Sequence, residues 1–448
     1  MRETLVKTEE FKDSPVGRIP KDWELRKLTD IASYQNGKSF PSLDYSESGR
    51  PLLRPGNLPD DDFVLWDEAH TTYLPLKWAE LAPDYIVLGE ELVMNLTAQS
   101  LDDQFLGRVC MTPPDTFCLL NQRIARFRAK DCYLPFLFWA LKGTYFRAQI
   151  DRIPQGTKVQ HIYNSDLDAI ILPMPKEQSE QRAITEILFT LSALVRSQES
   201  LIAKLKLMKA GLLHDLLTRG LDENGELRDA IGHPEQFQDS PLGRIPKDWE
   251  ATTIGEQAST SSGSTPNRSN PKYWQDGTIA WVKTGEVNYT FIQDTEEKVT
   301  QKALSETSLT VYPVDTVLMA MYGQGVTRGK VGILGIEATT NQACAAIIPK
   351  DNKLVSRYLF HYLSYYYDEI RSISHGSNQS NLNERLIASF PIQLPPIKEQ
   401  IRIVEMIDIH DTRIRTEEAY RDKLKLQKQG LMHDLLTGKV RVNSLGDK

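Results

Sequence analysis

The sequence lacks the features that mark secreted or membrane-spanning chains. Only four cysteines occur in 448 residues, none in a CxxC spacing, so neither a disulfide framework nor a cysteine-based zinc site is indicated. No apolar run approaches the roughly 20 residues that span a bilayer. Residues 1–5 are too polar for the start of a signal peptide. We therefore expect a cytoplasmic chain without a membrane partner.

Sequence motifs for catalysis are missing as well. There is no GxxxxGK[ST] phosphate loop, no GxSxG and no HExxH. The Asn/Asp-Pro-Pro-aromatic segment that methyltransferases acting on DNA amines require is also absent, and the eight histidines are scattered. The sequence therefore predicts no catalytic residue, no metal site and no cofactor bound by this chain.

The chain does contain one unit twice. Three segments recur in the same order and at nearly the same separation. They are FKDSPVGRIPKDWE (11–24) and FQDSPLGRIPKDWE (237–250), LPMPKEQ (172–178) and LPPIKEQ (394–400), and KLKLMKAGLLHDLLT (204–218) and KLKLQKQGLMHDLLT (423–437). The chain is therefore a tandem duplication of about 220 residues. Between these segments the copies diverge. Random drift after duplication would spread the differences evenly along the chain, so the concentrated divergence favours two blocks that perform different tasks of one kind.

Each copy consists of a variable block followed by a preserved segment. Short strand-like and helical runs alternate within the blocks, which predicts an α+β fold for each. The predicted divisions are 1–171 (first block), 172–221 (first long helix), 222–393 (linker and second block) and 394–448 (second long helix and tail).

The preserved segments predict two long helices that pair with each other. Their apolar residues recur in steps of three and four, which is typical of a coiled-coil seam, although a core-facing helix has similar spacing. The predicted seam residues are Ile184, Ile187, Leu191, Leu194, Leu201, Leu205, Met208 and Leu212 in the first helix, and Ile403, Ile407, Ile414, Leu424 and Leu431 in the second.

Basic and amide-rich loops favour a nucleic-acid partner, although the net charge of −7 argues weakly against one. Asn and Gln can bond adenine edges, Arg and Lys can bond guanine or phosphate, and Gly lets the backbone approach closely. A solvated charged face is the alternative. The predicted DNA contacts are Arg126, Arg128, Gln155, Gly156, Thr157, Lys158 and Gln160 in the first block, and Gln324, Thr327, Arg328, Lys330, Gly376, Ser377, Asn378, Gln379, Ser380 and Asn381 in the second.

The order of block, PxxKEQ helix, block and PxxKEQ helix resembles the specificity subunit of a type I restriction-modification enzyme. The recurring GRIPKDW and GLLHDLLT/GLMHDLLT segments belong to this resemblance. Residues 262–287, SGSTPNRSNPKYWQDGTIAWVKTGEV, are similar to the opening of a target-recognition domain in that family. The first block lacks the matching TP…YW signature.

The resemblance implies that each block reads one half of a bipartite, asymmetric site in double-stranded DNA. It implies that the two helices pack antiparallel as a spacer and dock two methyltransferase subunits, which restriction (translocase-nuclease) subunits join. S-adenosylmethionine, ATP and magnesium would then be bound by these partners. Two alternatives stay open: a duplicated coiled-coil scaffold without base readout, and a self-contained DNA methyltransferase, which the missing motifs disfavour.

Overall fold

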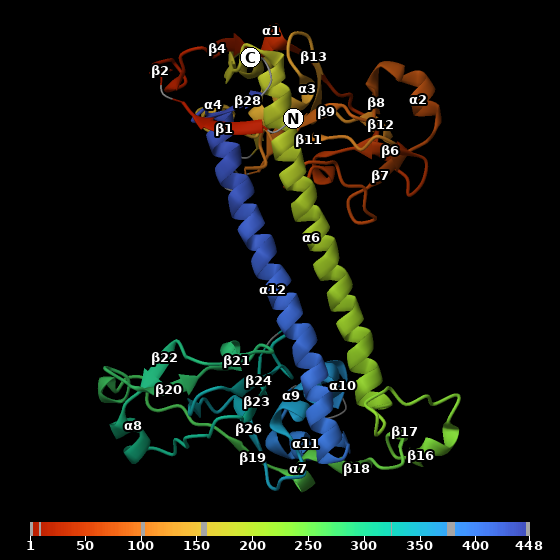
Figure 1. Ribbon diagram of the computed structural model, residues 1–448, viewed down its shortest axis with the longest axis vertical. Helices are drawn as coiled ribbons and strands as arrows, with labels where there is room; N and C mark the ends of the chain where they lie inside the picture. Colours follow the sequence, from red (N-terminus) through yellow and green to blue (C-terminus); the bar gives the residue numbers. More distant parts are fainter. Residues whose placement is uncertain are drawn as a thin grey trace. The chain divides into compact units, whose positions relative to one another are not determined.

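The computed structural model describes residues 3–8, 10–99, 104–153, 159–323, 325–373 and 381–444 (Figure 1). The chain forms two compact units, residues 1–200 with 419–448 and residues 201–418. Helix α6 (Gln178–Thr218) begins in the first unit and ends in the second, whereas α12 (Ile397–Leu436) does the reverse. This division differs from the predicted one because part of each helix packs into the core of each block.

Two four-stranded sheets form the body of the first unit. Their strand orders are β11-β9-β13-β5 and β7-β6-β12-β8. The strands are β5 (Ala32–Asn36), β6 (Arg50–Leu53), β7 (Thr72–Leu74), β8 (Ile86–Leu88), β9 (Leu92–Asn95), β11 (Val109–Met111), β12 (Phe117–Leu120) and β13 (Ile124–Ala129). The helices of the block are α1 (Leu28–Ile31), α2 (Lys77–Leu81), α3 (Leu134–Ala140), α4 (Thr144–Ile150) and α5 (Asn164–Ala169). Short pairs complete the unit: β1 (Glu3–Lys7) with β28 (Val440–Ser444), β2 (Phe11–Lys12) with β3 (Ile19–Pro20), β4 (Glu24–Lys27) with β15 (Ile171–Met174), and β10 (Thr97–Ala98) with β14 (Gln160–His161).

The second unit repeats this plan with a five-stranded sheet, β19-β26-β23-β24-β21, and a three-stranded one, β22-β20-β25. The strands are β19 (Ala258–Ser262), β20 (Ile279–Val282), β21 (Phe291–Ile292), β22 (Glu297–Val299), β23 (Val317–Ala320), β24 (Val331–Leu334), β25 (Thr339–Thr340) and β26 (Cys344–Pro349). The helices of the block are α7 (Ile254–Gln257), α8 (Gln301–Glu306), α9 (Ser356–Tyr365), α10 (Tyr367–Ile373) and α11 (Glu384–Ala388). Two pairs, β16 (Phe237–Ser240) with β17 (Gly243–Pro246) and β18 (Glu250–Thr253) with β27 (Pro391–Leu394), complete it.

The two diverged blocks therefore share one α+β fold, as predicted. The order β11-β9-β13-β5 in the first unit corresponds to β24-β23-β26-β19 in the second, and all of these pairings are antiparallel. Buried aliphatic and aromatic side chains fill both cores, so divergence has changed the residues without changing the topology.

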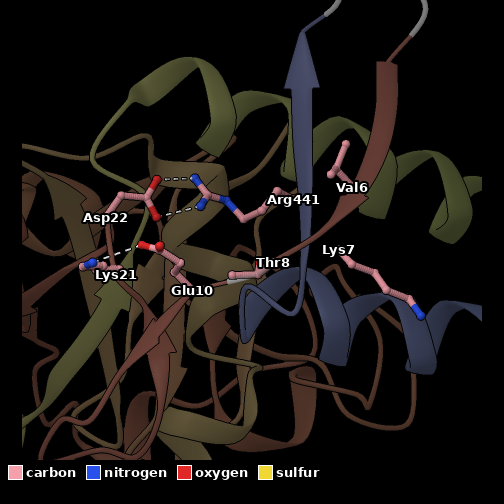
Figure 2. A pocket seen from close by; sticks show the side chains of 7 residues that line it. All are labelled: Val6, Lys7, Thr8, Glu10, Lys21, Asp22 and Arg441. Carbon is pink, nitrogen blue, oxygen red and sulfur yellow. Dashed lines mark hydrogen bonds and ion pairs between the residues drawn. The ribbon is translucent and has the colours of Figure 1, made fainter.

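The start of each long helix is fixed by an arginine that follows the end of the other helix. In the first unit Glu180 of α6 accepts hydrogen bonds from the Arg441 guanidinium, at 2.5 and 2.6 Å. Arg441 also donates to both oxygens of Asp22, at 2.7 and 2.8 Å, as Figure 2 shows. The hydrogen bond to Glu180 is the main reason that the pKa of Arg441 is raised. Asp22 belongs to the recurring KDW segment, which explains why that segment is preserved.

The second unit repeats this junction with other residues. Arg228, ten residues after α6, donates to both oxygens of Glu399 at 2.7 and 3.1 Å and to Asp248 at 2.8 Å. The indole of Trp249 donates to Glu399 at 3.1 Å. Asp248 and Trp249 stand in the second KDW segment, so equivalent acids serve both junctions.

The structure also corrects the register of the recurring Glu-Gln pair. The Gln181 side chain accepts from the Tyr133 amide and donates to the Pro175 carbonyl, both at 3.0 Å. Gln400 makes the equivalent bonds to Val355 and Pro395, both at 2.8 Å. Gln400 is thus matched by Gln181, not by Gln178 of the KEQ motif. The separation of 219 residues (400 − 181) equals that of the KLKL segments (423 − 204).

Within each unit the two long helices run antiparallel. In the first unit Glu199 pairs with Lys425 at 2.7 Å, and in the second unit Lys206 pairs with Glu418 at 2.6 Å and Lys209 with Asp411. Partner numbers on α12 fall as those on α6 rise within the second unit, as antiparallel packing requires. No helix in the described part of the chain is long and apolar enough to cross a membrane.

The seam of α12 lies where the pattern placed it, but that of α6 is rotated. Ile403, Ile407, Ile414 and Leu424 are buried and Leu431 is half-buried. On α6, Ile184 is buried and Ile187, Leu191, Leu205 and Leu212 are half-buried. The predictions for Leu194, Leu201 and Met208 are wrong, because these side chains are 47%, 36% and 60% exposed.

The buried face of α6 instead carries Leu188, Val195 and Ile202, one residue further along in each heptad. Ser192 and Gln198 are buried on the same face. One residue corresponds to a rotation of about 100°. The apolar count misplaced the seam because polar residues occupy part of the true one.

Candidate nucleic-acid interface

One edge of the main sheet in the first unit gathers the loops with amide and basic side chains. Strands β5 and β9 end at this edge, and β11 and β13 begin there. The loops are joined by backbone hydrogen bonds. The Gln122 amide donates to the carbonyl of Lys38 at 3.0 Å, and the Leu96 amide donates to the carbonyl of Arg123 at 2.9 Å. The Ile162 amide donates to Leu96 at 2.9 Å. These separate chain segments therefore form one surface.

The equivalent edge of the second unit is formed by the ends of β19 and β23 and the starts of β24 and β26. Here too the loops are joined, because the Leu382 amide donates to Met321 at 3.1 Å and the Ser264 amide donates to Thr340 at 2.9 Å. The Met321 amide in turn donates to Ala343 at 2.8 Å. Each block thus presents a set of connected loops at the same place in its fold.

Several predicted contacts lie at these edges. The loop before β24 contains Thr327, Arg328 and Lys330. Asn381 directly precedes Leu382, whose amide is hydrogen-bonded to Met321, and Gln160 lies in β14, paired with Ala98. Ten predicted contacts fall outside the described residues. They are Gln155, Gly156, Thr157, Lys158, Gln324, Gly376, Ser377, Asn378, Gln379 and Ser380.

The structure does not place Arg126 at this surface, and that prediction is wrong. Arg126 is 3% exposed, and its guanidinium donates to the carbonyls of Asp84 (2.8 Å) and Ile86 and to Gln35. Arg128 has a 62% exposed side chain, but it lies near the opposite end of β13 and is 3.5 Å from Glu91. A count of basic residues cannot separate an arginine that faces the interior from one at the loop edge.

Sequence reasoning missed Lys38, Arg108, Gln122 and Arg123 at the first edge. Two short sequence matches between the blocks could have identified Arg108 and Gln122, but they include neither Lys38 nor Arg123. Gly107-Arg108-Val109 corresponds to Gly329-Lys330-Val331, and Asn121-Gln122 corresponds to Asn341-Gln342. Both asparagine side chains accept a backbone N–H two residues on, at 3.1 Å, and both following glutamines are exposed. The asparagine therefore shapes the turn, and the glutamine is the side chain exposed at the edge, where Gln342 also accepts a hydrogen bond from the Thr265 hydroxyl.

One group of metal-ligand residue types occurs in the described residues, in the second unit. Ligand atoms of His361, Asp408 and Asp411 lie within 4.8 Å of one another. Both carboxylates are already paired, Asp408 with Arg357 at 2.6 Å and Asp411 with Lys209 at 2.5 Å. Because these cations already neutralise the acids, we interpret the group as an ion-pair cluster between α9 and the long helices, not as a metal site.

Comparison with solved structures identifies the class of fold. The crystal structure of a type I restriction-modification S subunit from M. genitalium aligns with a TM-score of 0.56 at 15% identity, covering 92% of this chain and 96% of that one. A structure described as the basis of complex assembly and conformational transition of a type I R-M system also aligns at 0.56 and 15%, covering 94% and 99%. The duplicated fold with two long helices is thus that of S subunits.

The sequence comparisons lead to the family itself. The Type I restriction modification DNA specificity domain matches residues 20–207 and 246–426, and the chain belongs to this family. The putative type I restriction enzyme MjaX specificity subunit of Methanocaldococcus jannaschii is 24% identical over 448 residues, 98% of this chain and 99% of that protein. The EcoR124I/EcoR124II specificity subunit of Escherichia coli is 27% identical over 179 residues, 39% and 44% of the two chains. The predicted resemblance is confirmed.

Proposed function

We propose that this chain reads a bipartite, asymmetric site in double-stranded DNA, with one half-site for each block. In this proposal the paired helices dock two methyltransferase subunits, to which restriction subunits bind. The chemistry, with S-adenosylmethionine, ATP and magnesium, belongs to those partners. A methylated adenine would be flipped into the partner's pocket and not into this chain.

The observation that carries the proposal is that the two blocks share one fold but present different side chains at the same loop edge of the main sheet. The loop after β5 and the loop after β19 make equivalent backbone bonds, from Lys38 to Leu120 at 3.0 Å and from Ser264 to Thr340 at 2.9 Å. At the neighbouring turn the first block has Arg123 where the second has Ala343. Sequence is read by side chains at base edges. Different side chains on a common scaffold are therefore suited to two different half-sites.

Methylation mapping tests this proposal. The chain is expressed with its methyltransferase partners, and methylated positions are mapped across the host genome. Exchanging residues 255–390 for the corresponding block of another family member should change one half of the methylated sequence and leave the other half and the gap intact. As a matched control, exchanging the linker residues 229–236, which keeps the bond between Arg228 and Glu399, should leave the whole site unchanged. Methylation of only the original site by the block exchange would refute the assignment.

The same system separates the alternatives. A scaffold without base readout would support assembly, but its methylation would not depend on either block. A self-contained methyltransferase would transfer label to DNA as the purified chain alone, whereas we expect transfer only with the partner subunits.

A further inference from the structure

The loops that precede β11 and β24 keep one backbone geometry although their sequences have diverged. In the first unit the Gly107 amide donates to the backbone carbonyl of Asn95 at 2.9 Å, and the Asn95 amide donates to the backbone carbonyl of Arg108 at 2.8 Å. The Arg108 amide closes a turn on Phe105 at 3.2 Å. Gly107 has a φ of +73°, which residues other than glycine rarely adopt.

The second unit reproduces this geometry. The Gly329 amide donates to Ala320 at 2.9 Å, and the Ala320 amide donates to Lys330 at 2.9 Å. The Lys330 amide closes the turn on Thr327 at 3.1 Å, and Gly329 has a φ of +87°. Arg108 and Lys330 are therefore equivalent residues, each next to the glycine that sets the turn.

In each unit an arginine from the second helix after the loop holds that loop by hydrogen bonds to its carbonyl groups. Arg147 of α4 donates to the carbonyl of Leu106, the residue before the glycine, at 2.8 Å. Arg371 of α10 donates to the equivalent carbonyl of Arg328 at 3.0 Å and to Gly325 at 2.8 Å. A guanidinium that holds loop carbonyls fixes the path of the backbone and hence the origin of the next side chain.

Both loop cations also rest against an aromatic ring. The Arg108 guanidinium lies 4.8 Å from the centre of the Phe105 ring, and the Lys330 ammonium lies 5.8 Å from that of Tyr289. The Lys330 ammonium donates to Asn288 at 2.8 Å, which leaves it further donor capacity because an ammonium has three N–H groups. The two cations are thus held at the loop edge by packing as well as by the backbone.

We infer that Arg108 and Lys330 bind backbone phosphates, one in each half-site, and that Arg147 and Arg371 are positioning residues for them. The inference rests on the proposed function. Base contacts must differ between two unlike half-sites, but phosphates are the same in every sequence. A cation and a positioning arginine that survive in both diverged blocks therefore fit the part of DNA that both half-sites share.

Preservation alone does not make a phosphate contact, and the chain provides the matched control. Lys130 and Lys350 also stand at equivalent places, after the ends of β13 and β26, and both are exposed. Their ammonium groups donate to backbone carbonyls, of Thr29 at 3.0 Å and of Gly255, at the opposite end of the sheet. We assign these two lysines to the fold and not to DNA.

The test uses the complex of the full chain with its methyltransferase partners and a labelled duplex that carries the mapped methylation site. Binding is measured by fluorescence anisotropy over a series of salt concentrations. Arg108→Gln and Lys330→Gln should each lower the slope of log K against log salt by about one, and the double variant by about two. Lys130→Gln and Lys350→Gln should leave the slope unchanged, and all variants should methylate the same sequence.

The positioning residues require a readout that loss of stability does not move. Arg371→Ala should lower the slope as Lys330→Gln does, and combining the two should add little, because Arg371 acts through Lys330. Arg147→Ala and Arg108→Gln should show the same non-additivity. Slopes equal to the wild type in Arg108→Gln and Lys330→Gln would overturn the inference. Failure of the wild-type complex to bind the duplex would instead overturn the proposed function.

Discussion

Each unit has an equivalent lysine on a long helix that forms an ion pair with a carboxylate, but the carboxylate comes from a different part of the fold in each unit. Lys209 and Lys428 occupy the same place in the two KLKLxKxG segments. In the first unit Lys428 lies 3.4 Å from Asp62, which belongs to a loop of the variable block. In the second unit Lys209 lies 2.5 Å from Asp411, which belongs to α12 itself.

The acid lies in the block in the first copy and in the long helix in the second. Phe63 bridges to Met111 and Phe291 pairs with Ile333, so Asp62 and Thr290 precede equivalent phenylalanines. In the helices, Ser192 stands where the second copy has Asp411, 219 residues later. The comparison shows that each lysine has a carboxylate partner and that the residue supplying this carboxylate differs. Block and helix are therefore matched within each unit.

The largest effect is expected from Asp62→Asn. The Asp62 side chain is fully buried and lies 3.0 Å from both Lys142 and Arg196. Removing the carboxylate leaves Lys142 and Lys428 without a carboxylate partner and Arg196 with only Asp61, at 3.8 Å. Breaking a buried ion-pair network in this way costs about 3–5 kcal/mol. Hydrogen exchange in β9 and β13 should accelerate accordingly, while exchange in β23 and β26 serves as the internal control. Equal protection in wild type and variant would contradict the prediction.

Transplanting the second unit's arrangement should recover most of that loss. Asp62→Thr combined with Ser192→Asp places the acid on α6, as Asp411 is placed on α12. We expect the double variant to be destabilised by no more than about 2 kcal/mol, which is less than the sum of the losses in the two single variants. Additive losses in a double-mutant cycle would show that the two arrangements are not interchangeable.

A smaller and pH-dependent effect follows from the same carboxylate. Burial alone would raise the pKa of Asp62, but the charges of Lys142 and Lys428, together with hydrogen bonds from Ser192 and Lys142, outweigh burial and lower it. A group with a lowered folded-state pKa contributes stability above its ordinary pKa, and this contribution is lost as the pH falls through the folded value. The stability difference between wild type and Asp62→Asn should therefore shrink on acidification below about pH 4. A difference that is constant down to pH 2 would contradict this.

The smallest effect is expected from Asp411→Asn. Asp411 and Lys209 have side chains 30% and 27% exposed, so water can replace the lost partner. Partly exposed ion pairs contribute about 1 kcal/mol or less. Urea unfolding and exchange in the second unit should change by no more than this. A loss as large as that of Asp62→Asn would mean that the two lysines are equally dependent on their acids.

The sequence was sufficient to predict the duplication, the fold class and both long helices, because repeated segments and helical spacing are local signals. The register details were not predictable in this way. Leu201 and Ile202 are both apolar, and only packing shows that Ile202 is buried and Leu201 is exposed. The same holds for Arg126 and Arg123, since Arg126 is buried within β13 and Arg123 is exposed in the turn before that strand.

The bond between Glu180 and Arg441 has a consequence for the order in which the protein is made. The second unit is a continuous stretch, residues 201–418, and can complete its core as soon as it leaves the ribosome. The first unit contains residues 419–448, so its Glu180 meets Arg441 only after 261 further residues have been added (441 − 180). The block that is synthesised first is therefore finished last, and until then the start of α6 exposes the apolar surface that the end of α12 will cover.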